Sequence, residues 1–269
     1  MDIELLQKRF GLMGARVRVG PVVPWRYARA GRPAGIDIRT DAEGEFFDIR
    51  LAAGAEPVYE VVDVRPELRH LLLLARGADG AKEKFLCGHD ERHWFVCAVP
   101  GAHVADVSTA LAALQPVEVR RAVLRRVRRA KNRLRRRNEA FVRQGEWFFI
   151  PESNLVVNEK LVNHNEPISR GAGSKPHMCQ YLYRTGGEAV MVCRRYPNGV
   201  APAEYEQILA SQRGAQGWDW RMMRRDARVY VRGRVWHPDH KTVVLAGWHR
   251  VLMNTEGRAP GRARVVFLD

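Results

Sequence analysis

The sequence predicts an α+β protein of mostly antiparallel sheets, arranged as two small units that a long Arg-rich helix joins. Three observations predict this class. Apolar and polar residues alternate with a period of two through both halves of the chain, as they do in half-buried strands. Short stretches with a helical period lie between those strands, and one long stretch, 119–141, keeps a helical period. We expect an α+β unit over 1–115, the connecting helix over 116–143 and a β-rich unit over 144–269.

The composition is that of a globular protein with an unusual excess of positive charge. The chain has 269 residues, of which 46% are hydrophobic and 28% charged, so it can bury a large core. No apolar run is long enough to span a membrane, and the first ten residues do not resemble a secretory signal. The 4 cysteines show no disulfide pattern. We therefore expect a cytoplasmic protein without a membrane partner.

The N-terminal unit opens with a helix over 2–14 and continues with strands. Alternation predicts strands around Val17, Ile36 and Phe47, and further strand-like runs cover 58–64 and 70–76. Segments 84–87 and 94–99 are expected to pair as a hairpin, and 104–114 to form a helix.

The C-terminal unit is expected to consist mainly of hairpins. A short strand over 146–150 comes first, and a hairpin follows in which 178–184 pairs with 188–195 around Thr185-Gly186-Gly187. That pairing would place Cys179 opposite Cys193, as two packed thiols. A helix over 202–212 and a second hairpin, 229–236 with 242–253 around the turn His237–His240, complete the unit.

The basic stretch is the most distinctive feature of the sequence. Between Arg120 and Arg137 it contains eleven cations and no acidic residue, and it supplies +11 of the net charge of +15. Such a helix could follow a nucleic-acid backbone and contact its phosphates. An acidic protein partner or a solvated connector would also explain the charge, whereas a stripe of Val and Ala disfavours lipid. The candidate nucleic-acid-binding residues are Arg120, Arg121, Arg125, Arg126, Arg128, Arg129, Lys131, Arg133, Arg135, Arg136 and Arg137.

Aromatic residues in the second half bear on the kind of nucleic acid. Exposed aromatic rings on a sheet beside cations would stack on unpaired bases, which favours RNA or single strands. The alternative is that these rings form the core. No zinc-finger, leucine-zipper or RNA-recognition-motif signature occurs. The residues concerned are Trp147, Phe148, Phe149, Tyr181, Tyr183, Trp218, Trp220, Trp236 and Trp248.

Histidines of the second half are candidate metal ligands. His237 and His240 occupy the first and fourth positions of one turn, so their Cα atoms should lie within about 7 Å. Together with His177 and His249 they could hold Zn²⁺, with Asp239 or Glu146 as base or fourth ligand. No other cofactor is expected, and the spacing matches no familiar zinc motif, so a metal-dependent nuclease or hydrolase is the alternative function. A second set, Cys87, His89, His93 and Cys97, should be scattered over two faces of a hairpin.

Three motifs resemble a family of bacterial proteins without a known function. They are LCGHDERHWFV (86–96), FVRQGEWFFIP (141–151) and YVRGRVWHPDHKTVVLAGWHRVLMNTE (230–256). The second half is also similar to small bacterial proteins in which an R-Q-G-D-like strand start precedes a His-bearing segment and an H-P-E/D-H turn. Here Glu146 replaces the Asp of that pattern, and His177 stands alone where the pattern has a His pair. The resemblance implies neither a fold nor an activity.

The sequence thus predicts an arginine-rich nucleic-acid-binding protein, with RNA or single strands favoured, and identifies no catalytic residue. A metal-dependent hydrolase and a scaffold that recruits an acidic partner are the alternatives.

Overall fold

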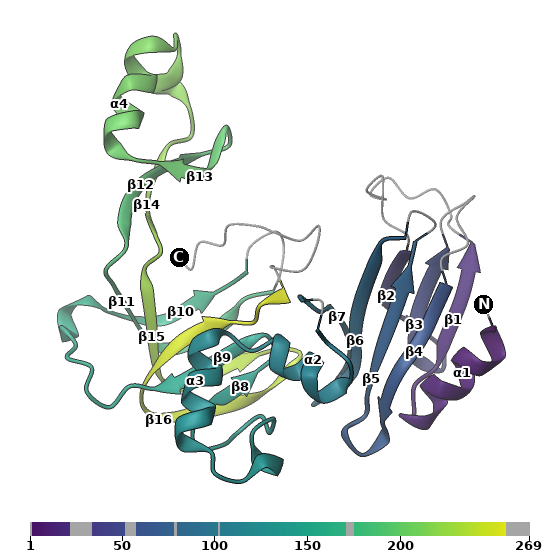
Figure 1. The fold of residues 1–269 in the computed structure, drawn as a ribbon. Coiled ribbons are helices and arrows are strands. Elements are labelled where there is room, and N and C mark those ends of the chain that lie inside the picture. The colour runs from purple at the N-terminus through teal and green to yellow at the C-terminus, as the bar shows by residue number, and fades with distance from the viewer. Residues whose placement is uncertain are drawn as a thin grey trace. The chain divides into compact units, whose positions relative to one another are not determined.

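The computed structural model confirms the α+β class, with four α-helices and sixteen strands in the part of the chain that it describes (Figure 1). It describes residues 2–21, 34–51, 58–77, 80–101, 103–170 and 175–256. The chain divides into two compact units. Unit 1 contains the described residues up to Asn138 and those from Asn254 onward, whereas unit 2 runs from Glu139 to Met253.

Unit 1 is built on two sheets. The first has the strand order β1-β3-β2 and the second the order β4-β5-β6-β7. β1 runs parallel to β3, and the other neighbours in these sheets are antiparallel. The elements are α1 (Ile3–Leu12), β1 (Val17–Pro21), β2 (Ala34–Asp41), β3 (Gly44–Leu51), β4 (Val58–Arg65), β5 (His70–Arg76), β6 (Lys82–Asp90) and β7 (His93–Ala98).

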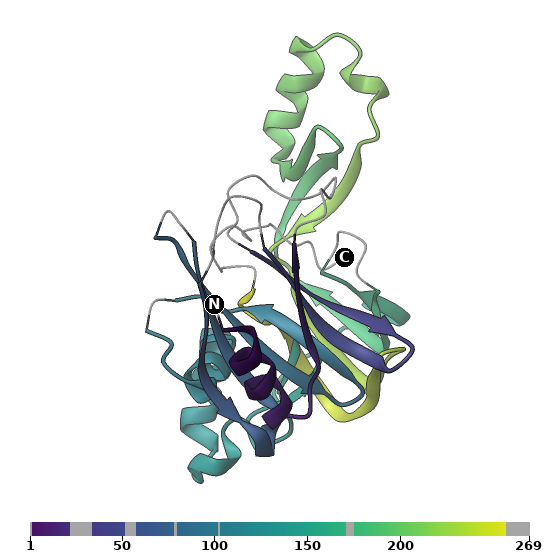
Figure 2. The same ribbon diagram turned by 90° about the vertical axis from the view of Figure 1, so that its right-hand side faces the viewer.

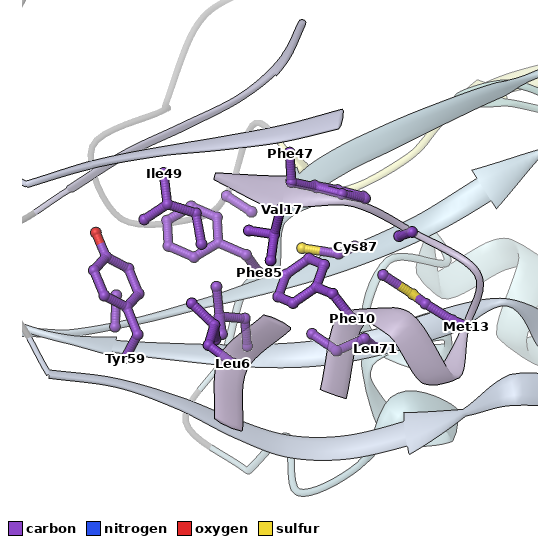
Figure 3. Close-up of a cluster of buried hydrophobic side chains, with 14 residues drawn as sticks. Leu6, Phe10, Met13, Val17, Phe47, Ile49, Tyr59, Leu71, Phe85 and Cys87 are labelled. Atoms are coloured by element: carbon purple, nitrogen blue, oxygen red, sulfur yellow. The ribbon is translucent and has the colours of Figure 1, made fainter. Parts of the chain in front are cut away.

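The main core of unit 1 combines side chains from α1 and from both sheets (Figure 3). Leu6 and Phe10 lie four residues apart on α1 and are both buried, as a helical period requires. Phe47 and Ile49 of β3 point to the same side because strand residues two apart share a face. The alternation in the sequence therefore identified the inward face of these strands.

The second face of the four-stranded sheet packs against α2 (Val107–Ala113). Leu72 and Leu86 contribute from the strands, and Val107 and Leu111 from the helix. Because both faces of β5 are covered, its residues 71–75 are all buried and read as a continuous apolar run. Asp106 and Thr109 form a capping box that begins α2.

Unit 2 contains a six-stranded antiparallel sheet with the order β10-β11-β15-β16-β9-β8. Its elements are β8 (Val142–Gln144), β9 (Trp147–Pro151), β10 (Val162–Ile168), β11 (His177–Thr185), β15 (Arg228–His237) and β16 (His240–Met253). The Met253 end of β16 pairs with Trp147, while a backbone carbonyl near its other end, at Lys241, accepts a hydrogen bond from Gln144. β16 therefore curves, so that the short β8–β9 hairpin reaches both of its ends. The predicted hairpin with the turn His237–His240 is confirmed as β15 and β16.

Residues 188–225, which we call the arm, form a three-stranded sheet with one helix (Figures 1 and 2). They comprise β12 (Glu188–Cys193), β13 (Tyr196–Val200), α4 (Pro202–Ser211) and β14 (Arg221–Arg225). The helix predicted over 202–212 is thus confirmed as α4. The predicted hairpin around Thr185-Gly186-Gly187 is wrong, because β11 pairs with β10 and β15, and β12 pairs with β13 and β14. The glycines instead carry the chain from one ladder to the next, with φ of +71° and +74°. Cys179 and Cys193 are consequently not opposite each other.

The long connecting helix expected over 116–143 is not confirmed. Its helical part, α3 (Val117–Arg126), ends where Val127 adopts extended backbone, and a single 3₁₀ turn over 130–132 follows. Cations four residues apart without an intervening acid weaken a helix by a few tenths of a kcal/mol for each pair, about the margin by which a short helix continues. Among the described residues, no helix combines the length and the apolar character needed to cross a membrane.

Candidate functional site

The basic segment, residues 120–137, begins on the exposed side of α3. The buried side of this helix consists of Val119, Ala122 and Val123. The arginines at 120, 121, 125 and 126 lie on the remaining sides and are exposed. Two of them, Arg125 and Arg126, occupy the last turn, where cations interact favourably with the helix dipole.

After α3 the basic segment continues as a loop, which the side chains of Asn138 and Arg136 hold in place. The side-chain amide of Asn138 donates to the backbone carbonyls of Asn132, Arg133 and Arg135, at 3.2, 3.4 and 3.3 Å. The guanidinium of Arg136 forms ion pairs with Asp90 and Glu91 at the β6–β7 turn. A continuous helix could not make these contacts, so they explain the conformation of the segment after Val127.

Most cations of the basic segment face solvent. Of the eleven, only Arg133 and Arg136 are half-buried. Arg136 is also the one cation of the segment with a carboxylate partner among the residues that the structure describes. The nine exposed cations are Arg120, Arg121, Arg125, Arg126, Arg128, Arg129, Lys131, Arg135 and Arg137.

The aromatic residues divide into core and half-exposed groups. Trp147, Phe148, Phe149 and Tyr183 are buried. On the six-stranded sheet, the guanidinium of Arg232 lies 5.1 Å from the ring of Tyr181 and 4.8 Å from that of Trp248. In the arm, Arg195 lies 4.3 Å above Trp218, which stacks on Trp220 and Tyr196. The half-buried aromatic residues are Tyr181, Trp218, Trp220, Trp236 and Trp248.

Three histidines of unit 2 meet at one end of the six-stranded sheet, and we call them the histidine group. His177 begins β11, His237 ends β15 and His240 begins β16. The ring centroid of His177 lies 4.2 Å from that of His237 and 5.2 Å from that of His240. One nitrogen from each ring lies within 4.8 Å of the other two, so the group could hold a metal ion.

His177 is the most deeply buried member of this group. It is 1% exposed, and both of its ring nitrogens lack a hydrogen-bond partner. An unsatisfied buried polar atom costs about 1–3 kcal/mol. Burial, and next the neighbouring imidazoles, lower the pKa of His177 to about 3. The ring is therefore neutral near pH 7, the state in which an imidazole nitrogen can bind a metal.

The β8–β9 hairpin lies against the histidine group. The buried amide of Gln144 donates to the carbonyls of Val235 and Lys241, on the strands that carry His237 and His240. A Cβ at Gly145 would lie 2.7 Å from Nε2 of His240, and its φ of +55° also favours glycine. The sequence reasoning missed Gln144. The Arg143-Gln144-Gly145-Glu146 motif contained it, but nothing in the sequence indicated that this turn meets the histidines.

The other candidate ligands do not join this group. His249 is held by its Nδ1 at 2.7 Å from the carbonyl oxygen of Gly247, and it is not part of any cluster found among the described residues. The carboxylate of Asp239 forms an ion pair with Lys175 at 2.9 Å. Cys87 and Cys97 belong to different core clusters, which confirms that the Cys87–Cys97 set is scattered over two faces.

No protein-family model, no curated protein and no solved structure matches this chain. The resemblance of its motifs to bacterial families therefore stays a prediction, and its own side chains are the basis for a functional proposal.

Proposed function

We propose that this protein binds nucleic acid and that the basic segment contacts its phosphates. One observation carries the proposal: nine exposed cations lie within eighteen consecutive positions, and none has a carboxylate partner among the described residues. Charges of one sign at this density repel one another and lower the stability of the fold. A polyanion bound from outside would remove that repulsion.

Several arginines elsewhere in the fold have carboxylate partners. Arg16 pairs with Asp41 at 2.6 Å, Arg184 with Glu166 at 3.0 Å and Arg225 with Glu188 at 2.7 Å. Carboxylates thus lie within reach of arginines on both units. Exposed arginines without a carboxylate partner among the described residues also occur elsewhere, for example Arg9 and Arg213. The basic segment differs in gathering nine such cations within eighteen positions, and that density suits an external anion.

Phosphate is an anion that suits these cations well. All but Lys131 carry a guanidinium, which binds two phosphate oxygens at once. Each phosphate of a single strand that is neutralised adds about 0.7 to the slope of log affinity against log salt. If all nine exposed cations took part, the slope would be about −6.

Single strands or RNA are the favoured ligands. The segment is helical only to Arg126, so it cannot lie in a major groove as one long reading helix. The half-exposed rings of Tyr181 and Trp248 flank Arg232 on the sheet of unit 2, an arrangement that suits stacking of unpaired bases. Both features favour contact with a backbone and with bases that are not paired.

A salt titration tests the proposal. Fluorescence anisotropy would follow the binding of labelled RNA, single-stranded DNA and duplex DNA of equal length, from about 50 to 300 mM salt. Replacing Arg121, Arg125 and Arg129 by glutamine should reduce the slope by about 2 for a single strand. The matched control replaces Lys8, Arg9 and Lys82, three exposed cations elsewhere in unit 1, and should leave the slope unchanged.

Two outcomes would overturn the proposal. One is the absence of binding to any of the three oligonucleotides at about 50 mM salt, where phosphate contacts are strongest. The other is equal binding to polyglutamate at the same salt, which would favour the acidic protein partner instead.

A second candidate function is hydrolysis of a substrate by a bound Zn²⁺ ion. The observation that favours it is the histidine group, since its three imidazoles could hold Zn²⁺ and leave one position open, and the ion would there supply a water of lowered pKa. Its test is cleavage of an oligonucleotide by Zn²⁺-loaded protein, compared with the stripped protein and with His240→Ala. Equal cleavage by all three preparations would reject it.

A further inference from the structure

We infer that the histidine group of unit 2 is a binding site for a divalent transition-metal ion, with Zn²⁺ as the ion that suits its donors best. The inference goes beyond nucleic-acid binding, because the basic segment belongs to unit 1 and the histidine group to unit 2. Each can therefore fail without the other.

The register of the strands brings the three histidines together. β11 pairs with β15 so that Met178 faces Trp236 and Cys179 faces Val235. The same register places His177 opposite His237, which itself pairs with His240 across the β15–β16 turn. Residues directly opposite each other project from the same face of a sheet. The pairing of the strands thus determines that all three imidazoles project from the same face of the sheet.

The burial of His177 indicates a missing partner. A buried imidazole is normally hydrogen-bonded through at least one nitrogen. In His177 neither nitrogen has such a bond, although the side chain is 1% exposed. A metal ion bound by one nitrogen would give this side chain the partner that the protein does not provide.

Packing alone is a weaker explanation of the group. The rings of His177 and His237 are stacked, with an angle of 23° between their planes, and packing without a metal ion would also explain that arrangement. However, Oε1 of Gln144 and Nε1 of Trp147 are also buried without a hydrogen-bond partner. Gln144 is bonded to the strands of His237 and His240, and the ring of Trp147 lies 6.3 Å from that of His177. Several unsatisfied polar atoms around one group indicate a polar occupant.

The donor set determines which ion fits. Three imidazole nitrogens, with no carboxylate or thiolate in the group as the described residues define it, suit Zn²⁺, Co²⁺, Ni²⁺ or Cu²⁺. Mg²⁺ and Ca²⁺ require oxygen ligands. Zn–N bonds of about 2.0–2.1 Å require nitrogens about 3.4 Å apart, so the rings must turn from their stacked arrangement toward one centre. His240 is partly exposed, so an ion can reach the group from solvent.

Binding also changes one existing contact. Nδ1 of His237 accepts a hydrogen bond from the backbone N–H of Asp239 at 3.1 Å. If the metal binds Nδ1, it displaces this bond. If it binds Nε2, the proton moves to Nδ1, which then no longer accepts. Either way, one backbone hydrogen bond is exchanged for a metal–nitrogen bond.

Metal titration of the full chain tests the inference. Protein stripped with a chelator would be titrated with Zn²⁺ against a chromophoric competitor, and with Co²⁺ while its visible absorption is recorded. We expect about one ion per chain, absorption typical of tetrahedral or five-coordinate Co²⁺, and no competition from Mg²⁺. His240→Ala should weaken Zn²⁺ binding at least about 100-fold, because loss of even an outer partner costs 10–100-fold. The control, His164→Ala, removes an exposed histidine of β10 in the same sheet and should bind as the wild type does.

Two results would overturn the inference. One is a wild-type protein that binds well below one ion per chain and whose thermal stability does not respond to Zn²⁺. The other is unchanged Zn²⁺ affinity in His240→Ala. His240 is partly exposed, so its replacement tests the site even where His177→Ala fails to fold. RNA binding measured on the same preparations reports on nucleic-acid binding, which does not require the histidine group, and separates the two proposals.

Discussion

Replacing Gln144 by alanine should destabilise unit 2 by about 2–3 kcal/mol. Gln144 is fully buried, and its amide donates two hydrogen bonds, at 3.2 Å to the carbonyl of Val235 and at 2.8 Å to that of Lys241. Each bond contributes about 0.5–1.5 kcal/mol, and a buried carbonyl that loses its donor adds to the cost. The loss concerns the contact between the β8–β9 hairpin and the β15–β16 turn, so it should affect unit 2 and not unit 1.

Hydrogen exchange measured by mass spectrometry resolves the two units. Each 1.36 kcal/mol of lost stability raises the exchange rate about tenfold. The slowest amides of β15 and β16 should therefore exchange about 30- to 160-fold faster in Gln144→Ala. Amides of α1 and β5 in unit 1 should not change. Gln144→Met, which keeps the volume but not the donors, should retain most of the effect.

The matched control is Gln212→Ala. Gln212 is exposed, and its amide donates one bond, at 3.2 Å, to the hydroxyl of Tyr196, so its loss should cost less than about 0.5 kcal/mol. Hydrogen-exchange rates of β15 and β16 in Gln144→Ala equal to those of the wild-type protein would refute the reasoning. If these rates in Gln144→Met equalled those of the wild-type protein, packing and not hydrogen bonding would stabilise the hairpin.

Three further predictions concern ionisable and thiol groups. Removing Arg136 (Arg136→Ala) deprives Asp90, which is 7% exposed, of an ion-pair partner and should destabilise unit 1 by about 2–4 kcal/mol in urea denaturation. The Arg16 hydrogen bond lowers the pKa of Asp41 from 3.8 to about 2, so Asp41→Asn should be less stable than the wild type above about pH 4. That difference should disappear as the pH falls through about 2, since the carboxylate is then protonated in both states. Burial raises the pKa of the Cys179 thiol to about 12. All four cysteines (Cys87, Cys97, Cys179 and Cys193) are buried thiols, so a thiol reagent at about pH 8 should react rapidly only after denaturation.

Local patterns were sufficient where an element is determined by its own residues. The strands of unit 1 were predictable because turn residues separate short alternating runs, as around Phe47 and Ile49. The β15–β16 hairpin was predictable from its Pro238-Asp239 turn between two apolar runs. In both cases the pairing partner is the nearest strand in the sequence, or close to it.

Prediction failed where a distant partner decides the structure. The Thr185-Gly186-Gly187 segment has the composition of a hairpin turn, but both edges of β11 are occupied by strands from other parts of the chain. The basic stretch has a helical period throughout, but contacts with Asp90 and with Asn138 determine its conformation after Val127. These contacts join residues that lie apart in the chain, and no local pattern in a single sequence indicates them.

The candidate metal site was only partly predictable for the same reason. His237 and His240 share a turn, so their proximity followed from local geometry. His177 joins them through the β11–β15 register, which skips the whole arm, and Gln144 joins them through the curvature of β16. His249 was an equally reasonable candidate in the sequence, but its ring is held by the carbonyl of Gly247.

Asn138→Ala separates the charge of the basic segment from its conformation. The Asn138 amide donates to three carbonyls of the loop, and losing those bonds should favour local opening by about 1–2 kcal/mol, a factor of about 5–30. Trypsin, which cleaves after lysine and arginine, should then cut within residues 128–137 faster by about that factor. The number of cations is unchanged, so the salt slope for RNA should equal that of the wild type, while the affinity at fixed salt should fall because a more mobile loop must be ordered on binding. A lower slope in Asn138→Ala, comparable with that of the triple arginine variant, would contradict this reasoning, because it would mean that the loop conformation determines how many cations reach phosphate.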